Sequence, residues 1–425
     1  MNNEILILLN IKNKDLKVVE IKEEEIKKKK VTVVVVESTK KKVRCPECNN
    51  YTSSVHDRLN PIRCKYLDTG GVQCILNIKK RRFICHKCNK KFTEKLLINE
   101  AGKTLSNSLR IKIRKELLEY NLSIKYIAKI NNVSDNTVRN ELLDAMKSYP
   151  ESIKLLPMVI SFDEFKADTD EGKYAFIIND PIHKKTLEIL PSRRKEFLMQ
   201  YFTKVENRRD VKFIISDMYE PYLLVQKIMF PNAKYVVDRF HYIRYIMDAL
   251  DKIRIRIEKS YSYNSKEYRL LKNKKNVSLL RKYGKEISWF VYDKRYRNGR
   301  MFEILPSTIL DEIYKIDEVI KRGYQLKEMF LDIVNFSTYE TATKEFMAWI
   351  ELCKESNIPE FIQASNTINN WLEYIVNSFI DIRYSNGYTE GLNNKIKVIK
   401  RNGYGYKSFK FLRLRLLYIL NGKLR

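Results

Sequence analysis

Length, composition and charge indicate a multidomain globular protein whose partner is a polyanion. The chain has 425 residues, of which 44% are apolar and 12% aromatic. This composition excludes a disordered polymer, and the length favours about two to four domains. Lys and Arg outnumber Asp and Glu by 81 to 52, a net charge of +29, so nucleic acid is the first partner to test. An anionic membrane surface, or enrichment of Lys by codon bias, is the alternative explanation.

We expect the chain to be neither exported nor held in a membrane. It contains no run of about 18 apolar residues. It begins Met1-Asn2-Asn3-Glu4, which is acidic and polar and does not resemble a cationic signal. In such a protein the seven cysteines are expected to be reduced and to bind metal rather than to form disulfides.

The first 100 residues predict strands followed by a zinc module. Within residues 1–40, Leu16–Ile21 and Val31–Val36 are rich in β-branched residues and favour short strands. Residues 41–100 hold two CxxC knuckles, each able to place two thiolates on one tetrahedral zinc ion; the four predicted ligands are Cys45, Cys48, Cys85 and Cys88. The second knuckle starts 37 positions after the first ends, so we expect a β-hairpin to close that distance.

Other groups near the knuckles have less certain roles. Cys64 and Cys74 are expected to be packed thiols and His56 and His86 surface groups, with a substitute ligand role as the alternative for each. A basic run ends beside the second knuckle. Its Arg81 and Arg82 are candidate phosphate contacts, with a solvated face as the alternative.

Residues 101–150 have helical periodicity and contain a predicted helix-turn-helix. A short helix from Ile124 meets a turn at Asn131 and Asn132, and Ser134 caps the following helix. Asn tolerates the left-handed backbone that such a turn needs. The expected small core is Ile124, Ile127, Val133, Val138 and Leu142; the expected contacts to a major groove are Asp135, Asn136, Arg139 and Asn140. A helical hairpin that binds nothing is the alternative.

The pattern then changes to that of an α/β domain over residues 151–241. Five short apolar runs predict strands, with a helix around residues 194–205 before the fourth; the runs are Met158–Ile160, Tyr174–Ile178, Thr186–Leu190, Val211–Ile215 and Tyr235–Val237. Residues 242–380 are rich in Lys and Arg, follow a helical period and carry all three tryptophans. We interpret them as a large helical insertion.

Two of the predicted strands run into aspartates. Ile160-Ser161-Phe162 leads into Asp163, and Ile214-Ile215-Ser216 leads into Asp217. If these are the first and fourth strands of an RNase H-like sheet, they are adjacent and parallel, and the two carboxylates share one edge. Hard oxygen ligands of this kind hold pairs of Mg²⁺ ions in phosphoryl transfer. Taken alone, however, an aspartate at a strand end is common.

The third carboxylate has several candidates. Asp180 would lie at the opposite edge if its strand is antiparallel, Asp238 would lie at the correct edge, and Glu164, Asp168 and Asp170 are expected to face solvent. Glu390 is the better candidate. On a helix it would share one face with Asn394, Lys397 and Arg401, which suit a DNA backbone, while Leu392, Ile396 and Ile399 would pack on the other.

The motifs occur in a recognisable order. After the knuckles and the helix-turn-helix come Phe162-Asp163-Glu164-Phe165, Ser216-Asp217-Met218 and Asp238-Arg239-Phe240-His241; the C-terminal stretch then contains Asn386-Gly387, Glu390-Gly391-Leu392-Asn393-Asn394-Lys395-Ile396-Lys397 and Lys400-Arg401-Asn402-Gly403-Tyr404-Gly405-Tyr406. In this order the chain resembles the ISL-three family of bacterial insertion-sequence transposases. The similarity covers nearly the whole chain, and the C-terminal motif is its most specific part.

The resemblance implies a multidomain α/β protein with an RNase H-like mixed sheet. A DDE triad would fall on Asp163, Asp217 and Glu390, and the helical insertion would divide the catalytic core into residues 151–241 and 381–425. Two Mg²⁺ or Mn²⁺ ions and one structural Zn²⁺ are the expected cofactors. The expected partners are double-stranded DNA, as terminal inverted repeats and target, and further copies of the chain. The expected location is the bacterial cytoplasm, at the nucleoid.

Two other functions compete with a transposase. A transposase-derived zinc and helix-turn-helix regulator would bind DNA without chemistry, although all three carboxylates are present. A structure-selective nuclease or resolvase on the same fold would cut DNA without joining it.

Overall fold

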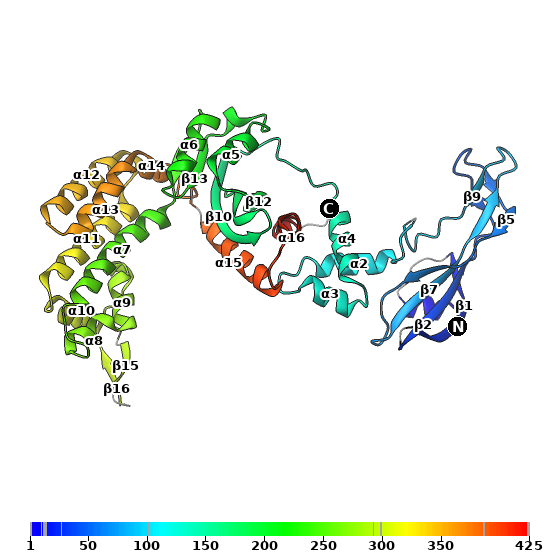
Figure 1. Ribbon diagram of the computed structural model, residues 1–425, viewed down its shortest axis with the longest axis horizontal. Coiled ribbons are helices and arrows are strands. Elements are labelled where there is room, and N and C mark those ends of the chain that lie inside the picture. The colour runs from blue at the N-terminus through cyan, green and yellow to red at the C-terminus, as the bar shows by residue number, and fades with distance from the viewer. Residues whose placement is uncertain are drawn as a thin grey trace. The chain divides into compact units, whose positions relative to one another are not determined.

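The computed structural model describes residues 2–9, 11, 15–26, 28–100, 102–291, 293–297, 300–385 and 387–422 (Figure 1). The chain divides into two compact units. Unit 1 comprises Met1–Tyr149, Ile396–Tyr406 and Lys410–Arg425, and unit 2 comprises Pro150–Lys395 and Lys407–Phe409. In the described ranges, no helix has both the length and the hydropathy needed to cross a membrane.

Unit 1 begins with a four-stranded sheet in the order β1-β2-β7-β6. Its strands are β1 (Leu16–Ile26), β2 (Lys29–Ser38), β6 (Ile62–Lys65) and β7 (Gln73–Lys79), and helix α1 (Asn2–Leu8) packs beside β1. Central β2 is covered on both faces, by one apolar cluster containing Val34 and Val36 and another containing Val31 and Val33. This burial explains its unbroken run of valines. Residues 1–40 and 41–100, expected as separate parts, therefore share one sheet.

The cysteine knuckles lie on two small β elements. The first knuckle joins β3 (Val43–Arg44) to β4 (Tyr51–Thr52); the second joins β8 (Arg81–Ile84) to β9 (Lys91–Thr93), with β5 (Val55–Arg58) completing the order β5-β8-β9. Between the knuckles the chain passes through β6 and β7 of the first sheet and then returns as β8. The expected hairpin under the second knuckle is confirmed by the antiparallel pairing of β8 with β9.

Three short helices follow in unit 1: α2 (Asn107–Glu116), α3 (Ile124–Ile130) and α4 (Asp135–Ala145). A serine hydroxyl caps each of the three helices. Ser134 caps α4, as predicted, and its hydroxyl accepts a hydrogen bond from the Thr137 amide at 3.2 Å. Asn132 adopts the left-handed backbone at φ +50°. Of the expected core residues, Val133 is half-buried and the other four are buried.

The C-terminal helix α16 (Phe409–Asn421) packs in unit 1 from Lys410 onward, although residues 381–425 were expected to belong to the α/β core. Arg415 on this helix is buried and hydrogen-bonds to the segment that follows α2. Its guanidinium donates to the carbonyl of Leu117 and, at 3.1 Å each, to those of Glu119 and Leu122. The hydroxyl of Tyr418 donates to the Arg114 carbonyl at 3.1 Å.

Unit 2 contains a five-stranded mixed sheet in the order β12-β11-β10-β13-β14. The strands are β10 (Val159–Thr169), β11 (Gly172–Asp180), β12 (Lys185–Leu190), β13 (Phe213–Ser216) and β14 (Lys234–Val237). β11 is antiparallel to β10 and β12, whereas β10, β13 and β14 are parallel to one another. All five predicted strands are therefore present.

Helices cover both faces of this sheet (Figure 1). On one face, Phe162 and Phe176 form an apolar core with residues of α5 (Lys195–Phe202) and α6 (Glu220–Met229). On the other face, polar groups of β10 and β11 meet the start of α15 (Gly387–Asn402). The period-two alternation along β10 thus sends Phe162 into the core and its neighbours Ser161 and Asp163 toward α15.

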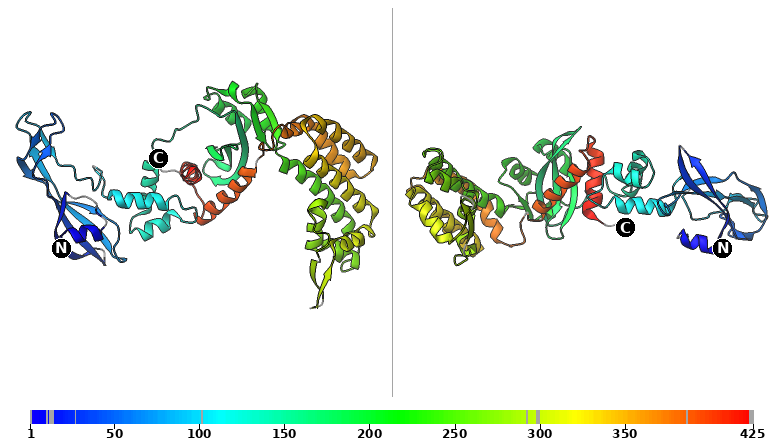
Figure 2. Two further views of the ribbon diagram at one scale, coloured as in Figure 1. Left: turned by 180° about the vertical axis from the view of Figure 1, so that it is seen from behind. Right: turned by 90° about the horizontal axis from the view of Figure 1, so that it is seen from below.

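The expected helical insertion begins with α7 (Arg239–Glu258), slightly before residue 242. The other helices are α8 (Lys266–Lys272), α9 (Lys274–Arg281), α10 (Pro306–Tyr314), α11 (Glu318–Phe336), α12 (Tyr339–Glu355), α13 (Pro359–Asn370) and α14 (Leu372–Val376), with one hairpin, β15 (Asp293–Arg297) and β16 (Arg300–Ile304). Helices α7 and α11–α13 pack into one group (Figure 2). Trp349 is buried in it, and Trp289 and Trp371 pack against its core.

We predict that Arg415→Met destabilises unit 1 by on the order of 3 kcal/mol, because it leaves buried carbonyls without a donor. Hydrogen exchange of the amides in α2 and α16 measures the loss. Lys410→Met, on the same helix but exposed, is the matched control and is expected to change protection little. Equal protection in both variants would contradict the role assigned to Arg415.

Candidate active site

Two aspartates meet at one end of the parallel strands in unit 2. The pairing of β10 with β13 ends at Ser161 and Ile215. Asp163 follows two residues later inside β10, which continues to Thr169, while Asp217 directly follows β13. The expectation that Asp163 ends its strand is therefore wrong, because β10 goes on pairing with β11 after its pairing with β13 has ended. Parallel strands still bring both carboxylates to the same edge.

The surroundings of Asp163 favour its neutral form when no cation is present. Its Oδ1 accepts from the Glu164 amide at 2.6 Å, and its Oδ2 accepts from Asn393 Nδ2 at 2.8 Å. Burial, followed by the nearby charge of Asp217, raises the pKa of Asp163 to about 7. Partly buried carboxylates that repel each other in this way are suited to a cation, which would neutralise both.

Asp217 is held from two sides. His241 Nε2, near the start of α7, lies 2.7 Å from Asp217 Oδ1, and the Tyr235 hydroxyl donates to the Asp217 carbonyl at 2.7 Å. Burial acts to lower the pKa of His241, but the contact with Asp217 outweighs it and the pKa is raised. The sequence pattern included His241 only as part of a motif and gave it no role; its contact with Asp217 depends on where α7 starts.

Helix α15 packs against this edge of the sheet. The Thr389 hydroxyl lies 3.3 Å from that of Ser161 and accepts from Asn179 Nδ2 at 3.2 Å. Asn393, one turn further along, reaches Asp163. Glu390 lies in α15 between these two contacts, but its side chain is outside the described part of the chain, as is the whole of Asn386. The third expected carboxylate therefore belongs to a helix that contacts Asp163 through Asn393.

The first part of α15 also supplies oxygen atoms near the carboxylates. Asn393 Oδ1 is buried and, among the described residues, has no hydrogen-bond partner. This amide oxygen belongs to the side chain that contacts Asp163, and it is a hard donor of the kind that Mg²⁺ and Mn²⁺ prefer. Sequence reasoning selected Asn394 on this helix and overlooked Asn393.

The two faces of α15 are as predicted. Leu392, Ile396 and Ile399 are buried, while Asn394, Lys397 and Arg401 are exposed. The exposed face has the composition expected of a surface that contacts phosphates.

The remaining acidic residues near Asp163 lie in different surroundings. Glu164 was expected to face solvent, but it is half-buried in β10, where Arg193 and the Tyr222 hydroxyl both contact its carboxylate. Asp168 is exposed, and Asp170 Oδ1 accepts from the Phe409 amide at 2.8 Å. Because β10 lies between two strands, its side chains point alternately to the two covered faces of the sheet. The charges that flank Asp163 in the sequence did not predict this burial.

Asp180 and Asp238 are the two other candidates for the third carboxylate ligand. Asp180 ends antiparallel β11, at the opposite edge, where it contacts His183 Nδ1 at 2.7 Å. Asp238 is buried directly after β14, at the residue that precedes α7. Asp238 thus shares the edge of Asp163 and Asp217, as its strand order predicted.

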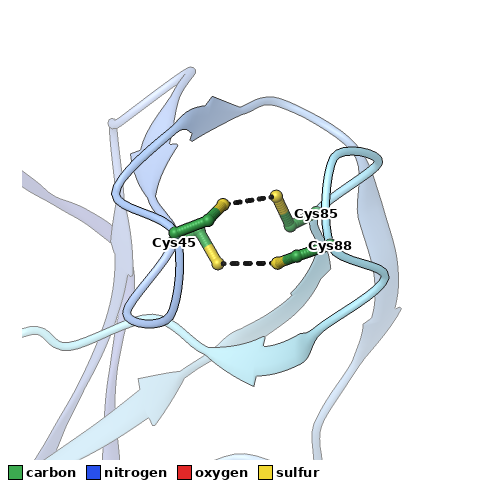
Figure 3. Close-up of side chains that lie close together, drawn as sticks. Cys45, Cys85 and Cys88 are labelled. Carbon is green, nitrogen blue, oxygen red and sulfur yellow. Dashed lines mark hydrogen bonds between the residues drawn. The ribbon is translucent and has the colours of Figure 1, made fainter.

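The four knuckle cysteines converge in unit 1 (Figure 3). Cys45 Sγ lies 3.6 Å from Cys88 Sγ, Cys48 Sγ lies 3.5 Å from Cys85 Sγ, and all four sulfurs are within 4.8 Å of one another. Tetrahedral zinc with Zn–S bonds of about 2.3 Å separates sulfurs by about 3.8 Å. The Asn50 backbone and side-chain amides lower the pKa of Cys48 to about 6, which favours the thiolate. The cluster fits one structural zinc ion.

The four alternative ligands lie outside the cluster. Cys64 and Cys74 are buried in β6 and β7, and burial raises the pKa of Cys64 to about 12 and that of Cys74 to about 11. His86 Nε2 lies 2.7 Å from the Ser54 hydroxyl. Within the described residues, the set of metal-ligating side chains in this module is the four knuckle cysteines.

The side chains of unit 1 that were predicted to contact DNA differ in their exposure and in the contacts that they make within the protein. Arg81 is held by the buried carboxylate of Glu94, at 2.8 Å from Nη2, and Arg82 lies 3.3 Å from Asp57 at the surface. Asn136 and Asn140 are exposed on α4. The Arg139 guanidinium lies 5.0 Å from the centre of the Phe411 ring.

The protein is modular and has two candidate metal sites. One is formed by carboxylates of the mixed sheet, and the other by the four knuckle thiols. A family model described as transposase, for the DDE transposases of the ISL3 group, matches residues 160–416. A second, described as the zinc-finger of transposase IS204/IS1001/IS1096/IS1165, matches residues 41–88. The first match covers more than half of the chain, so the chain belongs to the ISL3 family of transposases, as the motif order predicted.

Two known proteins are similar in sequence. One is the transposase for insertion sequence element IS1001 of Bordetella parapertussis, 22% identical over 398 residues that make up 92% of each chain. The other is a protein of Lactococcus lactis subsp. lactis named ATP-dependent protease, 32% identical over 127 residues, or 29% of this chain and 38% of that one. The second similarity is too short for that protein's activity to be transferred to this chain.

We predict about one zinc ion per chain, lost when Cys85 is replaced by serine, because three thiolates no longer complete the tetrahedron. Metal analysis of the purified protein measures the content. Cys64→Ser, a buried thiol outside the cluster, is the control and should retain the ion. Loss of zinc from a folded Cys64→Ser variant would show that the ligand set is different.

Proposed function

We propose that the protein is an insertion-sequence DNA transposase that cuts and joins DNA strands with Asp163, Asp217 and Glu390. The observation that carries this proposal is the position of α15, whose Asn393 donates to Asp163 while Asp163 and Asp217 share one edge of the parallel strands. The strand order 3-2-1-4-5 of the mixed sheet, with its second strand antiparallel to the first, supports an RNase H-like core.

The carboxylates and Asn393 would hold two Mg²⁺ or Mn²⁺ ions. When bound, such ions activate the attacking oxygen and stabilise the leaving oxygen of a phosphoryl transfer. The chain's own groups position the ligands: Asn393 orients Asp163, and His241 with Tyr235 fixes Asp217. These contacts hold the carboxylates before DNA arrives, which reduces the reorganisation that the reaction requires.

Unit 1 would recognise DNA. Helices α3 and α4 are joined by a tight turn at Asn132 and leave Asn136 and Asn140 exposed, which supports a helix-turn-helix with α4 in the major groove. Together with the zinc module it would bind the terminal inverted repeats of the element, and the net charge of +29 would add contacts to phosphates. Joining the two ends of one element requires that both be held together, so we infer that the protein acts as a homo-oligomer on paired ends.

We predict that Asp163→Asn abolishes both nicking and strand joining, because an amide is a poorer cation ligand and cannot balance the charge. The assay supplies labelled inverted-repeat DNA, target DNA and Mg²⁺ or Mn²⁺, and resolves nicked from joined product. Asp180→Asn, at the opposite sheet edge, is the matched control and should retain activity. Glu390→Gln is expected to behave like Asp163→Asn.

The same assay separates the competing functions. Product from either Asp163→Asn or Glu390→Gln would remove that residue from the triad. Nicking without joined product would identify a nuclease, and DNA binding without either product would identify a regulator.

We further predict that Mn²⁺ binds more tightly as pH rises toward 7, by about tenfold per pH unit, and that the affinity then levels off. The pKa of Asp163 is about 7 in the metal-free protein, so below that pH the ion must displace a proton. Electron paramagnetic resonance of free Mn²⁺ gives the affinity at each pH. Asp163→Asn should bind weakly with no such slope; a slope that persists in this variant would contradict the assignment.

A further inference from the structure

Unit 2 has a cavity of about 470 Å³ whose lining includes Asp217 and His241 and extends beyond them to side chains that the proposed chemistry does not use. Its wall on the sheet side includes Glu164, Arg193, Tyr219 and Tyr222. Its volume lies in the range of about 300–1,000 Å³ typical of pockets that hold a small organic ligand. A space of this size has room for a single nucleotide.

The aromatic wall of the cavity is held in place. The Tyr219 and Tyr222 rings meet edge to face, with centres 4.8 Å apart and planes at 83°. The Tyr222 hydroxyl and Arg193 both contact the Glu164 carboxylate, and the Arg193 guanidinium lies 4.3 Å from the centre of the Tyr174 ring. Planar groups fixed in this way form a stacking surface that costs little entropy to use.

The opposite wall is one face of α7, the helix that starts at the sheet edge (Figure 1). Its lining residues fall at positions i, i+3, i+4, i+7 and i+11 and so share one side of the helix: His241, Arg244, Tyr245, Asp248 and Lys252. Tyr245 is 48% exposed and Tyr219, across the cavity, is 37% exposed. Both rings are therefore accessible to a ligand. Lys252, and Arg244, which lies 3.7 Å from Asp248 on the same helix, are the cations that this wall offers to a phosphate.

We propose that this cavity receives one unstacked nucleotide of the DNA strand beside the catalytic carboxylates, with its base against Tyr219 and Tyr245. The inference rests on the proposed function and deepens it. Asp217 is part of the cavity lining, the rings of Tyr219 and Tyr245 are accessible there, and the cations Arg244 and Lys252 lie on the α7 side. A nucleotide that leaves the duplex loses its base stacking, and a fitted pocket with aromatic rings replaces that stacking.

The first test is fluorescence of 2-aminopurine placed, one position at a time, on either side of the cleavage point in inverted-repeat DNA. Asp163→Asn protein with Mg²⁺ provides a complex that does not cut. Stacking on neighbouring bases quenches 2-aminopurine more strongly than contact with tyrosine, so we expect its fluorescence to rise several-fold at the one position where it leaves the duplex. Adding Tyr219→Ala or Tyr245→Ala should abolish the rise, whereas adding Tyr263→Ala, an exposed tyrosine outside the cavity, should preserve it.

The second test is cleavage. We expect Tyr245→Ala to cut fully paired DNA about tenfold more slowly or worse. An abasic site at the position where fluorescence rises removes the base that must be extruded. We expect it to restore the cleavage rate of the Tyr245→Ala variant to within about twofold of that of the unaltered protein. A tyrosine that serves only the fold would show no such rescue.

The outcomes distinguish this inference from the proposed function. Cleavage by the unaltered protein without brightening at any position would overturn the cavity proposal and leave the transposase proposal intact. A rise in 2-aminopurine fluorescence that depends on Tyr245, in a protein that never cuts DNA, would overturn the transposase proposal and support the cavity proposal. Slow cleavage by Tyr245→Ala without rescue by the abasic site would count against an extruded base.

Discussion

The active site depends on the place where β10 stops pairing with β13. Parallel pairing up to Ser161 and Ile215 sets the two strand directions, so that Asp163 and Asp217 emerge at one edge. The same geometry makes them repel each other in a partly buried space, which raises the pKa of Asp163. A site of this kind stores unfavourable electrostatic energy that a cation releases on binding. If the proposed cations bind there, the fold bears this unfavourable energy in the metal-free state.

The polar network around the carboxylates limits that unfavourable energy. Asn393 from α15 and the Glu164 amide hydrogen-bond Asp163, and His241 contacts Asp217. Each contact comes from a different element, so sheet, insertion and C-terminal helix must all be folded before the site is complete. The network extends through Glu164 to Arg193 and Tyr222 and ends at the aromatic cavity. A change in that cavity can therefore affect the carboxylates through contacts that are all within unit 2.

Unit 1 combines segments that are distant in sequence. Between the two knuckles the chain passes through β6 and β7 of the first sheet, and its return as β8 brings the four thiols together. A single zinc ion would then connect two β elements that are each too small to be stable alone. At the other end of the unit, buried Arg415 joins the C-terminal helix to the chain after α2. Both features connect distant parts of the chain through a few polar contacts.

Local patterns in the sequence determined the strands of the mixed sheet, the four thiols, the cap at Ser134, the buried and exposed faces of α15, and the family. These follow from short-range rules: side-chain periodicity, ligand spacing and capping chemistry act over a few residues. The family followed from motif order, which needs no coordinates.

Tertiary structure alone decided the contacts between elements. The sequence did not show that Asp163 lies inside its strand, that Glu164 is held by Arg193 and Tyr222, that Asn393 and His241 support the aspartates, or that Arg81 is held by Glu94. Nor did it show that residues 1–40 and 41–100 share a sheet, or that α16 packs in unit 1. Each of these depends on which side chains meet across long sequence separations, and a one-dimensional pattern does not encode the distances that decide it.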